Sequence, residues 1–380
     1  MAAYLCLALI LYAGSVAASA DSYAVAFDNG ILNAAEGQVS IEQVKEPYQF
    51  SGLATYFNNV LYYVVSESDI RQLKEPETIE LQQGEWLAIA GRSKVLLVKQ
   101  TGTPLSYSEA GIRVLNPEII KGADSASLIA DKTQLNDLDP ALNQLRYVHL
   151  WSGLAALAKM AEFMLVFIHD NVVSHWALTI ILFAVIVKIL LLPVTNLTKK
   201  SQDKVNLLRT ELDPKLAQIK QDFDGEEAHN KIMAAHKDLG ITPFFSLKPM
   251  LITLIQFPVL IAVFNALGEM PVFNGQSFLW IEDLAYPDAV GILPVQIPLL
   301  GDKISVLPVL MSVVTLLSVF VMRNEAVPAS VVRGQRINLA LMSLGFLILF
   351  YPFPASMVLY WTIANLLQLV ILSIQYARSS

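Results

Sequence analysis

Five long apolar runs dominate the C-terminal half of the chain and set the strongest limit on its fold. Each is long enough, or nearly so, to cross the hydrocarbon core of a bilayer, which takes about 20 helical residues. The runs cover residues 177–194, 246–267, 304–322, 337–351 and 355–376. We therefore predict a mainly α membrane protein with a five-helix transmembrane core over residues 175–376. Pro352 and Pro354 predict a tight turn between the last two runs.

Composition supports this prediction. Hydrophobic residues make up 54% of the chain and charged residues 16%, and mean hydropathy is +0.51, outside the usual range of soluble domains. The net charge of -7 argues against a nucleic-acid partner. The only cysteine, Cys6, excludes an intramolecular disulfide and a cysteine metal cluster.

Basic residues are concentrated in two of the connections between the apolar runs. Residues 198–243 carry eight Lys and Arg residues and residues 323–336 carry three, whereas residues 268–303 carry one lysine against five acidic residues. Lys and Arg accumulate on the cytoplasmic side of membrane proteins. We therefore predict a multi-pass protein of the bacterial inner membrane, with the N-terminal part in the periplasm and the C-terminus in the cytoplasm.

The N-terminal part has two segments of different character. Residues 1–20 read as a signal peptide that ends in small residues, with a retained N-terminal anchor as the alternative. Residues 21–140 alternate apolar and polar positions in short runs, for example at 38–42 and 78–81, and Gly91-Arg92-Ser93 is typical of a hairpin turn. This pattern predicts a small β-rich exported domain.

Residues 141–174 carry a helical pattern, with a helix expected from Pro140 to Val173. Apolar residues recur three and four apart, but Lys159, Glu162 and His169 interrupt them. We expect an amphipathic helix lying on the membrane surface. The alternative is a helix packed within the exported domain.

The charged connection 198–243 predicts a cytoplasmic helical hairpin. Apolar residues form a seam on one helical face from Val205 to Phe223, and Asp224-Gly225 then breaks the pattern. Its eight basic residues are matched by eight acidic ones. His229 and His236 lie about two turns apart, too far for one metal ion, and are expected to be solvated surface residues.

Lys188 is the outstanding residue, because it interrupts the first apolar run with a full positive charge. Such a charge costs about 2.5 to 3.5 kcal/mol at the middle of a membrane. Lys188 lies six residues before Val194, so one interpretation is that its side chain reaches the cytoplasmic surface. The other is that it faces a water-filled cavity among the helices, since the apolar runs offer no acidic partner.

Seven further polar residues of the apolar runs are weaker candidates for such a cavity. They are Thr253, Gln256, Asn265, Tyr360, Thr362, Asn365 and Gln368. The chain has no catalytic motif such as G-x-S-x-G or H-E-x-x-H and no glycine-rich phosphate loop. We therefore predict neither an enzyme nor a cofactor or metal site.

Five short motifs, together with the order of the segments, carry a resemblance to a known family. The motifs are KILLLPVT at 188–195, LDPKL at 212–216, IQFPV at 255–259, FLWIEDL at 278–284 and PASMVLYW at 354–361. Over residues 145–376 the chain resembles the YidC family of membrane protein insertases. The resemblance implies a five-helix bundle around a hydrophilic groove in which a cation attracts the exported part of a client protein.

Lys188 occupies the place of that cation, and the groove residues implied are Lys188, Gln256, Tyr360, Trp361 and Asn365. The family usually has arginine in place of Lys188, a threonine in place of Ala184 and a second tyrosine in place of Trp361, so a less polar groove is expected here. Partners implied are newly made membrane proteins, the bilayer and the Sec translocon. Ribosome binding by a basic tail is not expected, because none precedes Ser380.

Two functions of other classes compete with this interpretation. A small-solute or anion channel or transporter would use Lys188 as an anion-attracting site. A structural anchor would simply hold the exported domain at the membrane, although it needs neither Lys188 nor the charged hairpin.

Overall fold

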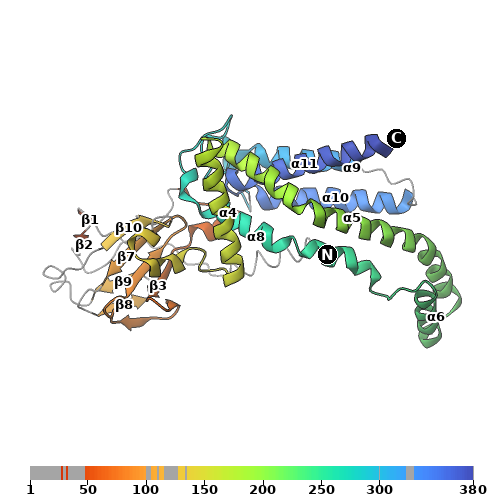
Figure 1. Cartoon of the computed structure of the whole chain (residues 1–380), viewed down its shortest axis with the longest axis horizontal. Coiled ribbons are helices and arrows are strands. Elements are labelled where there is room, and N and C mark those ends of the chain that lie inside the picture. Colours follow the sequence, from red (N-terminus) through yellow and green to blue (C-terminus); the bar gives the residue numbers. More distant parts are fainter. Residues whose placement is uncertain are drawn as a thin grey trace.

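The computed structural model describes residues 27–28, 31–32, 48–99, 104–108, 111–114, 127–132, 135–298, 300–321 and 329–379. The predicted signal segment 1–20 and the strand expected at 38–42 lie outside these residues. Strands occupy one end of an elongated molecule, and long helices extend from them side by side toward the other end (Figure 1).

Two antiparallel sheets form the strand end. The larger has the order β10-β7-β6-β3-β4 and the smaller β5-β8-β9. Their bounds are β3 Leu61–Val65, β4 Ile70–Gln72, β5 Glu77–Ile79, β6 Trp86–Ala90, β7 Lys94–Lys99, β8 Leu105–Ser108, β9 Gly111–Val114 and β10 Ser127–Asp131, with a further pair of β1 Phe27–Asp28 and β2 Ile31–Leu32. The pairing of Ala90 with Val95 confirms the turn predicted at Gly91-Arg92-Ser93.

The central strands β3, β6 and β7 of the larger sheet are buried on both faces, which explains their almost unbroken apolar sequences. Leu87 and Leu96 on one face pack with Leu105 of the smaller sheet. Ala88 and Leu97 on the other face pack with residues of α3 (Leu135–Leu138) and the 3-10 helix η2 (Pro140–Leu145). Alternate residues of each strand therefore serve two separate apolar cores.

Helix α4 (Ser152–Asn171) replaces the longer helix expected from Pro140, so that predicted start is wrong. The Asp139 side chain caps η2 by accepting from Ala141 N, and Tyr147 has a φ of 58°, which the right-handed helix excludes. Residues 140–145 therefore pack beneath the larger sheet. Figure 1 shows α4 lying across the ends of the long helices.

Helix α5 (Trp176–Asp222) runs without interruption from the first apolar run into the charged connection, through Pro193 and Pro214. Gly225, at a φ of 61°, then begins α6 (Gly225–Asp238), so the break predicted at Asp224-Gly225 is confirmed. His229 is exposed as expected. His236 is buried against Phe245, and its expected solvation is wrong.

The second apolar run forms two helices, α7 (Lys248–Leu254) and α8 (Phe257–Glu269), preceded by the 3-10 helix η3 (Phe245–Leu247). The interruption falls at Ile255 and Gln256, because Pro258 lacks the N–H that would bond to the carbonyl of Leu254.

The remaining elements lie in or beside the helix bundle. They are η1 (Gly52–Asn58), η4 (Pro271–Phe273), β11 (Ala289–Ile297), β12 (Gly301–Ser305), α9 (Leu307–Val321), α10 (Ala329–Phe350) and α11 (Ala355–Ser379). Helix α11 packs against α5, α8 and α9, while α10 packs on α9 and α4 on α8. The tight turn at Pro352 and Pro354 is confirmed, since α10 and α11 are separated by only four residues.

Four helical stretches of the described residues are long and apolar enough to cross a membrane: Ser152–Asn171, Trp176–Asp222, Phe245–Glu269 and Ala355–Ile374. The apolar helices Leu307–Ser318 and Arg336–Phe350 are shorter. The protein is thus mainly helical with several apolar helices, as predicted.

Candidate functional site

Lys188 lies half-buried on α5, and its Nζ donates a hydrogen bond of 2.7 Å to Oε1 of Gln368 on α11. The two residues are 180 positions apart in the chain. Water was expected to compensate the charge of Lys188. The structure adds the side-chain oxygen of Gln368 as a hydrogen-bond acceptor. An amide oxygen is neutral, so it offers hydrogen bonding but leaves the positive charge of Lys188 in place.

A row of polar residues leads along α11 up to this contact. Thr362, Asn365 and Gln368 are spaced three apart, which places them as neighbours along one side of the helix. Asn365 Nδ2 donates to Oγ1 of Thr315 on α9 at 3.0 Å. Thr362 instead bonds its own helix, through the carbonyl of Val358 at 2.7 Å. The row therefore joins α11 to α5 at Gln368 and to α9 at Asn365.

Tyr360 and Trp361 lie in an aromatic layer of the bundle core. The Tyr360 ring is buried and lies 6.0 Å from the Phe183 ring, centroid to centroid. The Trp361 ring lies 5.5 Å from those of Phe264, Phe346 and Phe350. Its indole N–H is buried, and no hydrogen-bond partner for it is found in the described part of the chain.

Gln256 sits at the interruption between α7 and α8, half-buried. Within the described residues, no hydrogen bond links it to Lys188. Of the five predicted groove residues, Lys188 and Asn365 therefore join the polar row of α11, Tyr360 and Trp361 pack among aromatic rings, and Gln256 lies elsewhere.

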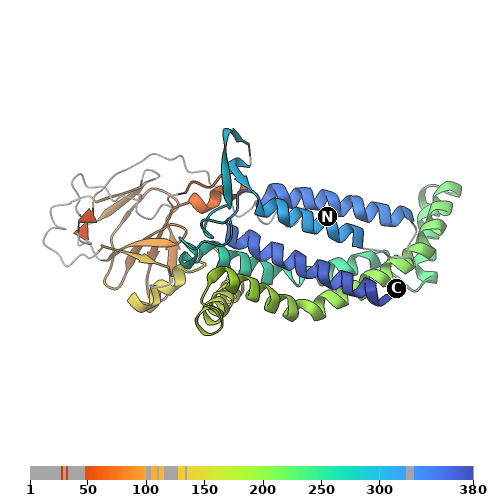
Figure 2. The ribbon, with the colours of Figure 1, turned by 90° about the horizontal axis from the view of Figure 1, so that it is seen from above.

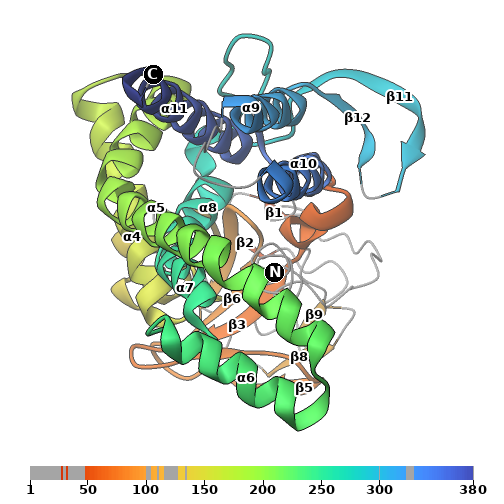
Figure 3. The ribbon, with the colours of Figure 1, turned by 90° about the vertical axis from the view of Figure 1, so that its right-hand side faces the viewer.

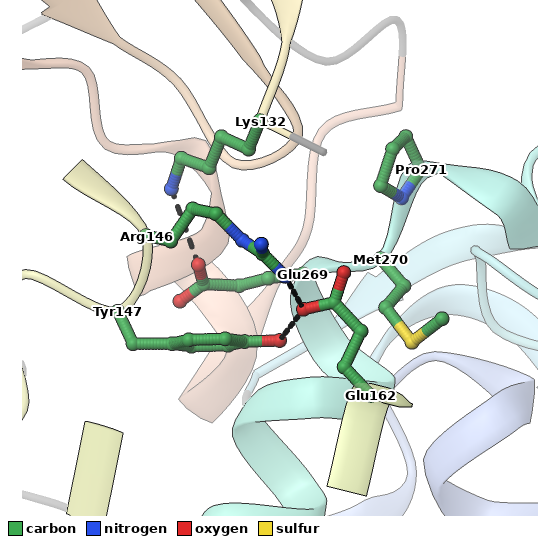
Figure 4. Close-up of a pocket in the computed structure, with 7 residues that line it drawn as sticks. All are labelled: Lys132, Arg146, Tyr147, Glu162, Glu269, Met270 and Pro271. Atoms are coloured by element: carbon green, nitrogen blue, oxygen red, sulfur yellow. Dashed lines mark hydrogen bonds and ion pairs between the residues drawn. The ribbon is translucent and has the colours of Figure 1, made fainter. Parts of the chain in front are cut away.

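A second polar cluster connects the strand end with the helices. Glu162 of α4 forms an ion pair with Arg146 and accepts a hydrogen bond of 2.9 Å from the Tyr147 hydroxyl. Close by, Lys132 is ion-paired to Glu269, at the end of α8, over 3.2 Å. Figure 4 shows these side chains directed at one another in one small pocket.

Glu162 and Glu269 are each paired with a basic residue, Arg146 and Lys132 respectively. Burial and the negative charge of Glu162 hold the pKa of Tyr147 well above its ordinary value, so this hydroxyl stays a donor. Nearby, Arg92 Nε donates to the carbonyl of Gly268 at 2.5 Å and its Nη1 to that of Ala285 at 2.9 Å. The first of these carbonyls belongs to the last turn of α8, where unpaired carbonyls attract a cation.

Sequence reasoning missed this cluster as a unit. Glu162 was visible only as an interruption of an apolar helix, and its pairing with residues of the preceding turn needs the chain reversal at Tyr147. The described residues hold no group of His, Cys, Asp and Glu that could bind a metal ion. The cluster holds the strand end on the bundle, and its charges are mutually neutralised.

Comparison with known families identifies the family of this chain. The family model described as 60Kd inner membrane protein matches residues 167–379, more than half of the chain. The chain belongs to this family. It is accordingly a membrane protein of an inner-membrane family, which agrees with its apolar helices.

Relatives within the 60Kd inner membrane protein family carry the name Membrane protein insertase YidC. The one from Chloroherpeton thalassium is 30% identical over 199 residues, which cover 52% of this chain and 32% of the relative. The one from Cupriavidus taiwanensis is 27% identical over 355 residues, 89% of this chain and 58% of the relative. The chain thus matches less than two thirds of the length of these relatives.

Among solved structures, the chain is similar to one described as an active YidC insertase crystal structure with the first transmembrane domain resolved. The TM-score is 0.39 at 16% sequence identity, and the match covers 82% of each chain.

Proposed function

We propose that this protein is a membrane protein insertase and chaperone that inserts hydrophobic segments into the inner membrane and helps them fold. The observation that carries the proposal is the half-buried Lys188 on an apolar helix, bonded to the neutral amide of Gln368. The membership of the 60Kd inner membrane protein family and the names of the relatives point the same way.

The physical role of Lys188 follows from its partner. A positive charge among apolar helices is costly unless water or an opposite charge compensates it. Because Gln368 supplies only a dipole, an acidic or polar segment of a client protein lowers the free energy of the site when it approaches Lys188. Such a segment is the part of a client that has to cross the apolar layer.

The polar row of α11 extends this site along the helix. Thr362, Asn365 and Gln368 offer hydrogen bonds at successive positions along the helix, and the N–H of Trp361, which has no partner among the described residues, lies beside them in sequence. We take this row, with Lys188 on one side and Thr315 on the other, as the hydrophilic groove. Tyr360 then supports the groove from the core, and Gln256 lies at the interruption between α7 and α8.

The rest of the chain is organised around this core in our proposal. Residues 21–140 form an exported periplasmic domain, α4 lies on the periplasmic membrane surface, and five spans follow with the hairpin of α5 and α6 in the cytoplasm. The loop charges support this orientation. Insertion requires no covalent chemistry, so the protein acts without catalytic residues.

The partners are newly made membrane proteins and the lipid bilayer, with the Sec translocon as a further candidate. The comparisons give no support to a channel or transporter.

Reconstitution in liposomes tests the proposal. Two clients that differ only in an exported segment, one neutral and one acidic, are offered to the wild type and to Lys188→Ala. The wild type is expected to insert both, and Lys188→Ala to lose mainly the acidic client, because the attracting charge is gone. Lys188→Arg keeps the charge and should retain both.

Lys200→Ala is the matched control, since Lys200 is an exposed lysine on the same helix. Failure of the wild type to insert either client would refute the insertase. Equal insertion of both clients by Lys188→Ala would refute the role of Lys188 but not the insertase function.

A further inference from the structure

The β11–β12 hairpin exposes large apolar side chains, which is energetically unfavourable in water. Ile292 is 68% exposed and Val295 67%. Further exposed apolar residues of the hairpin and its end are Val290, Ile297, Ile304 and Val306. The hairpin's charged residues are Asp302 and Lys303 of β12, and Lys303 pairs with Ile292 across the two strands. Exposed apolar side chains gathered on one short hairpin indicate an interaction site.

The hairpin has a fixed position at the edge of the bundle. The carboxylate of Asp288 accepts hydrogen bonds from the backbone N–H groups of Val306 at 3.0 Å and Leu307 at 2.6 Å, and from the Trp280 indole at 3.1 Å. It therefore ties the base of β11 to the first turn of α9. At the other end, Gly301 lies directly against Ser51.

The level of the hairpin along the molecule is that of α4. Figure 2 shows the light-blue hairpin at the end of the helix bundle nearest the strands, and Figure 1 shows α4 at the same end. Figure 3, which looks along the bundle, shows them on opposite sides, with the hairpin extending outward beyond α9 and α10. Helix α4 also exposes apolar side chains, among them Phe163 and Phe167.

The apolar stretches of α9 and α10, the helices next to the hairpin, are short for a membrane. Helix α9 has 15 residues, which at about 1.5 Å per residue extend about 22 Å, against a hydrocarbon core of about 30 Å. In the sequence only Met322 separates α9 from Arg323, so the apolar stretch gains almost nothing at that end. The missing length lies at the other end, where Val306, Ile304 and the hairpin continue the apolar surface.

We propose that the β11–β12 hairpin inserts into the outer leaflet and contacts phospholipid acyl chains. It completes the apolar surface of α9 and α10 on the side opposite α4, so that the protein rests on the leaflet at two places. Lipid is favoured over a protein partner because the exposed surface is continuous with the exposed face of α9 at Val309, Leu310 and Val313. This inference rests on the proposed orientation of the chain and is independent of insertase activity.

Lipid quenching of a fluorescent label tests the inference in the full-length protein. In a Cys6→Ser background, an environment-sensitive label is attached to Ile292→Cys or Val295→Cys, and the protein is placed in nanodiscs that contain spin-labelled phospholipids. Both positions are expected to emit at shorter wavelength and to be quenched most by spin labels close to the headgroups. Val313→Cys on α9 is the positive control, and it should be quenched most by deeper spin labels.

Glu282→Cys is the matched control for water, since Glu282 is exposed in the same connection between α8 and α9. Labels at Ile292 and Val295 that emit like the label at Glu282 and escape quenching would refute the inference. A shielded label that no lipid quenches would also refute it and would indicate a protein partner or a second copy. Orientation is measured separately, by the side from which a membrane-impermeant thiol reagent reaches Glu282→Cys.

Discussion

Charged side chains lie buried at the junction of strands and helices and half-buried in the helix bundle, and the two regions treat them differently. At the junction of strands and helices, Glu162 is paired with Arg146 and Glu269 with Lys132. In the helix bundle, Lys188 is bonded to the neutral amide of Gln368. The junction neutralises its own charges and has nothing to offer a ligand, whereas Lys188 keeps a charge that a client segment can use.

The comparison teaches that burial of a charge does not by itself indicate function; its partner decides. Removing one member of a buried ion pair leaves the other charge buried without a partner, so single substitutions at the junction should lower the stability of the fold. Removing Lys188, whose partner is neutral, leaves only the Gln368 amide without a hydrogen-bond partner. Lys188 should accordingly matter for activity more than for folding.

The largest effect on stability is expected for Glu162→Gln. The substitution leaves Arg146 buried against a neutral group and weakens the bond from Tyr147, and removal of one partner of a buried pair costs about 3 to 5 kcal/mol. Thermal unfolding in detergent, followed by tryptophan fluorescence, should show a clear fall in Tm. Asp170→Asn is the control on the same helix, because Asp170 is in an exposed pair with His169, worth about 0 to 1 kcal/mol. Equal effects of the two substitutions would contradict the closed character of the junction.

A smaller effect is expected for Arg92→Met. Arg92 bonds the carbonyls of Gly268 and Ala285 and lies over the rings of Phe50 and Phe57. Hydrogen bonds to charged groups contribute about 1.5 to 3 kcal/mol, and methionine retains part of the packing. Limited proteolysis should cleave between the strand end and the bundle faster than in the wild type. An unchanged cleavage rate would show that the ion pairs alone hold the two parts together.

The sequence predicted the elements of the fold better than their long-range contacts. Apolar runs located α5 and the helices from α7 to α11, and Gly91-Arg92-Ser93 located a hairpin, because both signals are local. The short helix break before Pro258 was available in the sequence and was overlooked. The burial of His236 against Phe245 depends on how the α5–α6 hairpin folds back, which no local pattern specifies.

The candidate site was predicted in the same uneven way. Lys188 was recognisable because a charge within an apolar run is energetically exceptional. Its bond to Gln368 joins residues 180 positions apart, and which of the several polar residues of the apolar runs would meet it depends on the packing of α11 against α5. The pairing of Lys132 with Glu269 crosses 137 positions for the same reason.

Lys188→Met should change stability less than Glu162→Gln does. The substitution removes a costly charge from an apolar helix and leaves the Gln368 amide without its donor, two effects of opposite sign. Thermal unfolding should therefore give a Tm close to that of the wild type, or slightly above it. A fall in Tm as large as that of Glu162→Gln would show that Lys188 is structural and would remove the contrast between the two regions.

The smallest effect is expected at Asp288, a buried carboxylate whose hydrogen bonds come from neutral N–H groups. Burial raises the pKa of Asp288 above its ordinary value, although these bonds oppose the shift. The folded state therefore binds the proton more tightly than the unfolded state does. The resulting contribution to stability is complete below the unfolded pKa and is lost as the pH rises through the folded pKa.

Asp288→Asn removes this dependence while it keeps an oxygen that accepts from Val306 and Leu307. The difference in Tm, wild type minus Asp288→Asn, should be largest below about pH 4, the ordinary pKa of an aspartic acid, and should shrink toward neutral pH. Glu282→Gln, at an exposed site in the same connection, is the control and should show little change across this range. A difference that grows as the pH rises would mean that the three N–H donors outweigh burial, and that a buried carboxylate held by neutral partners is stabilised as the anion.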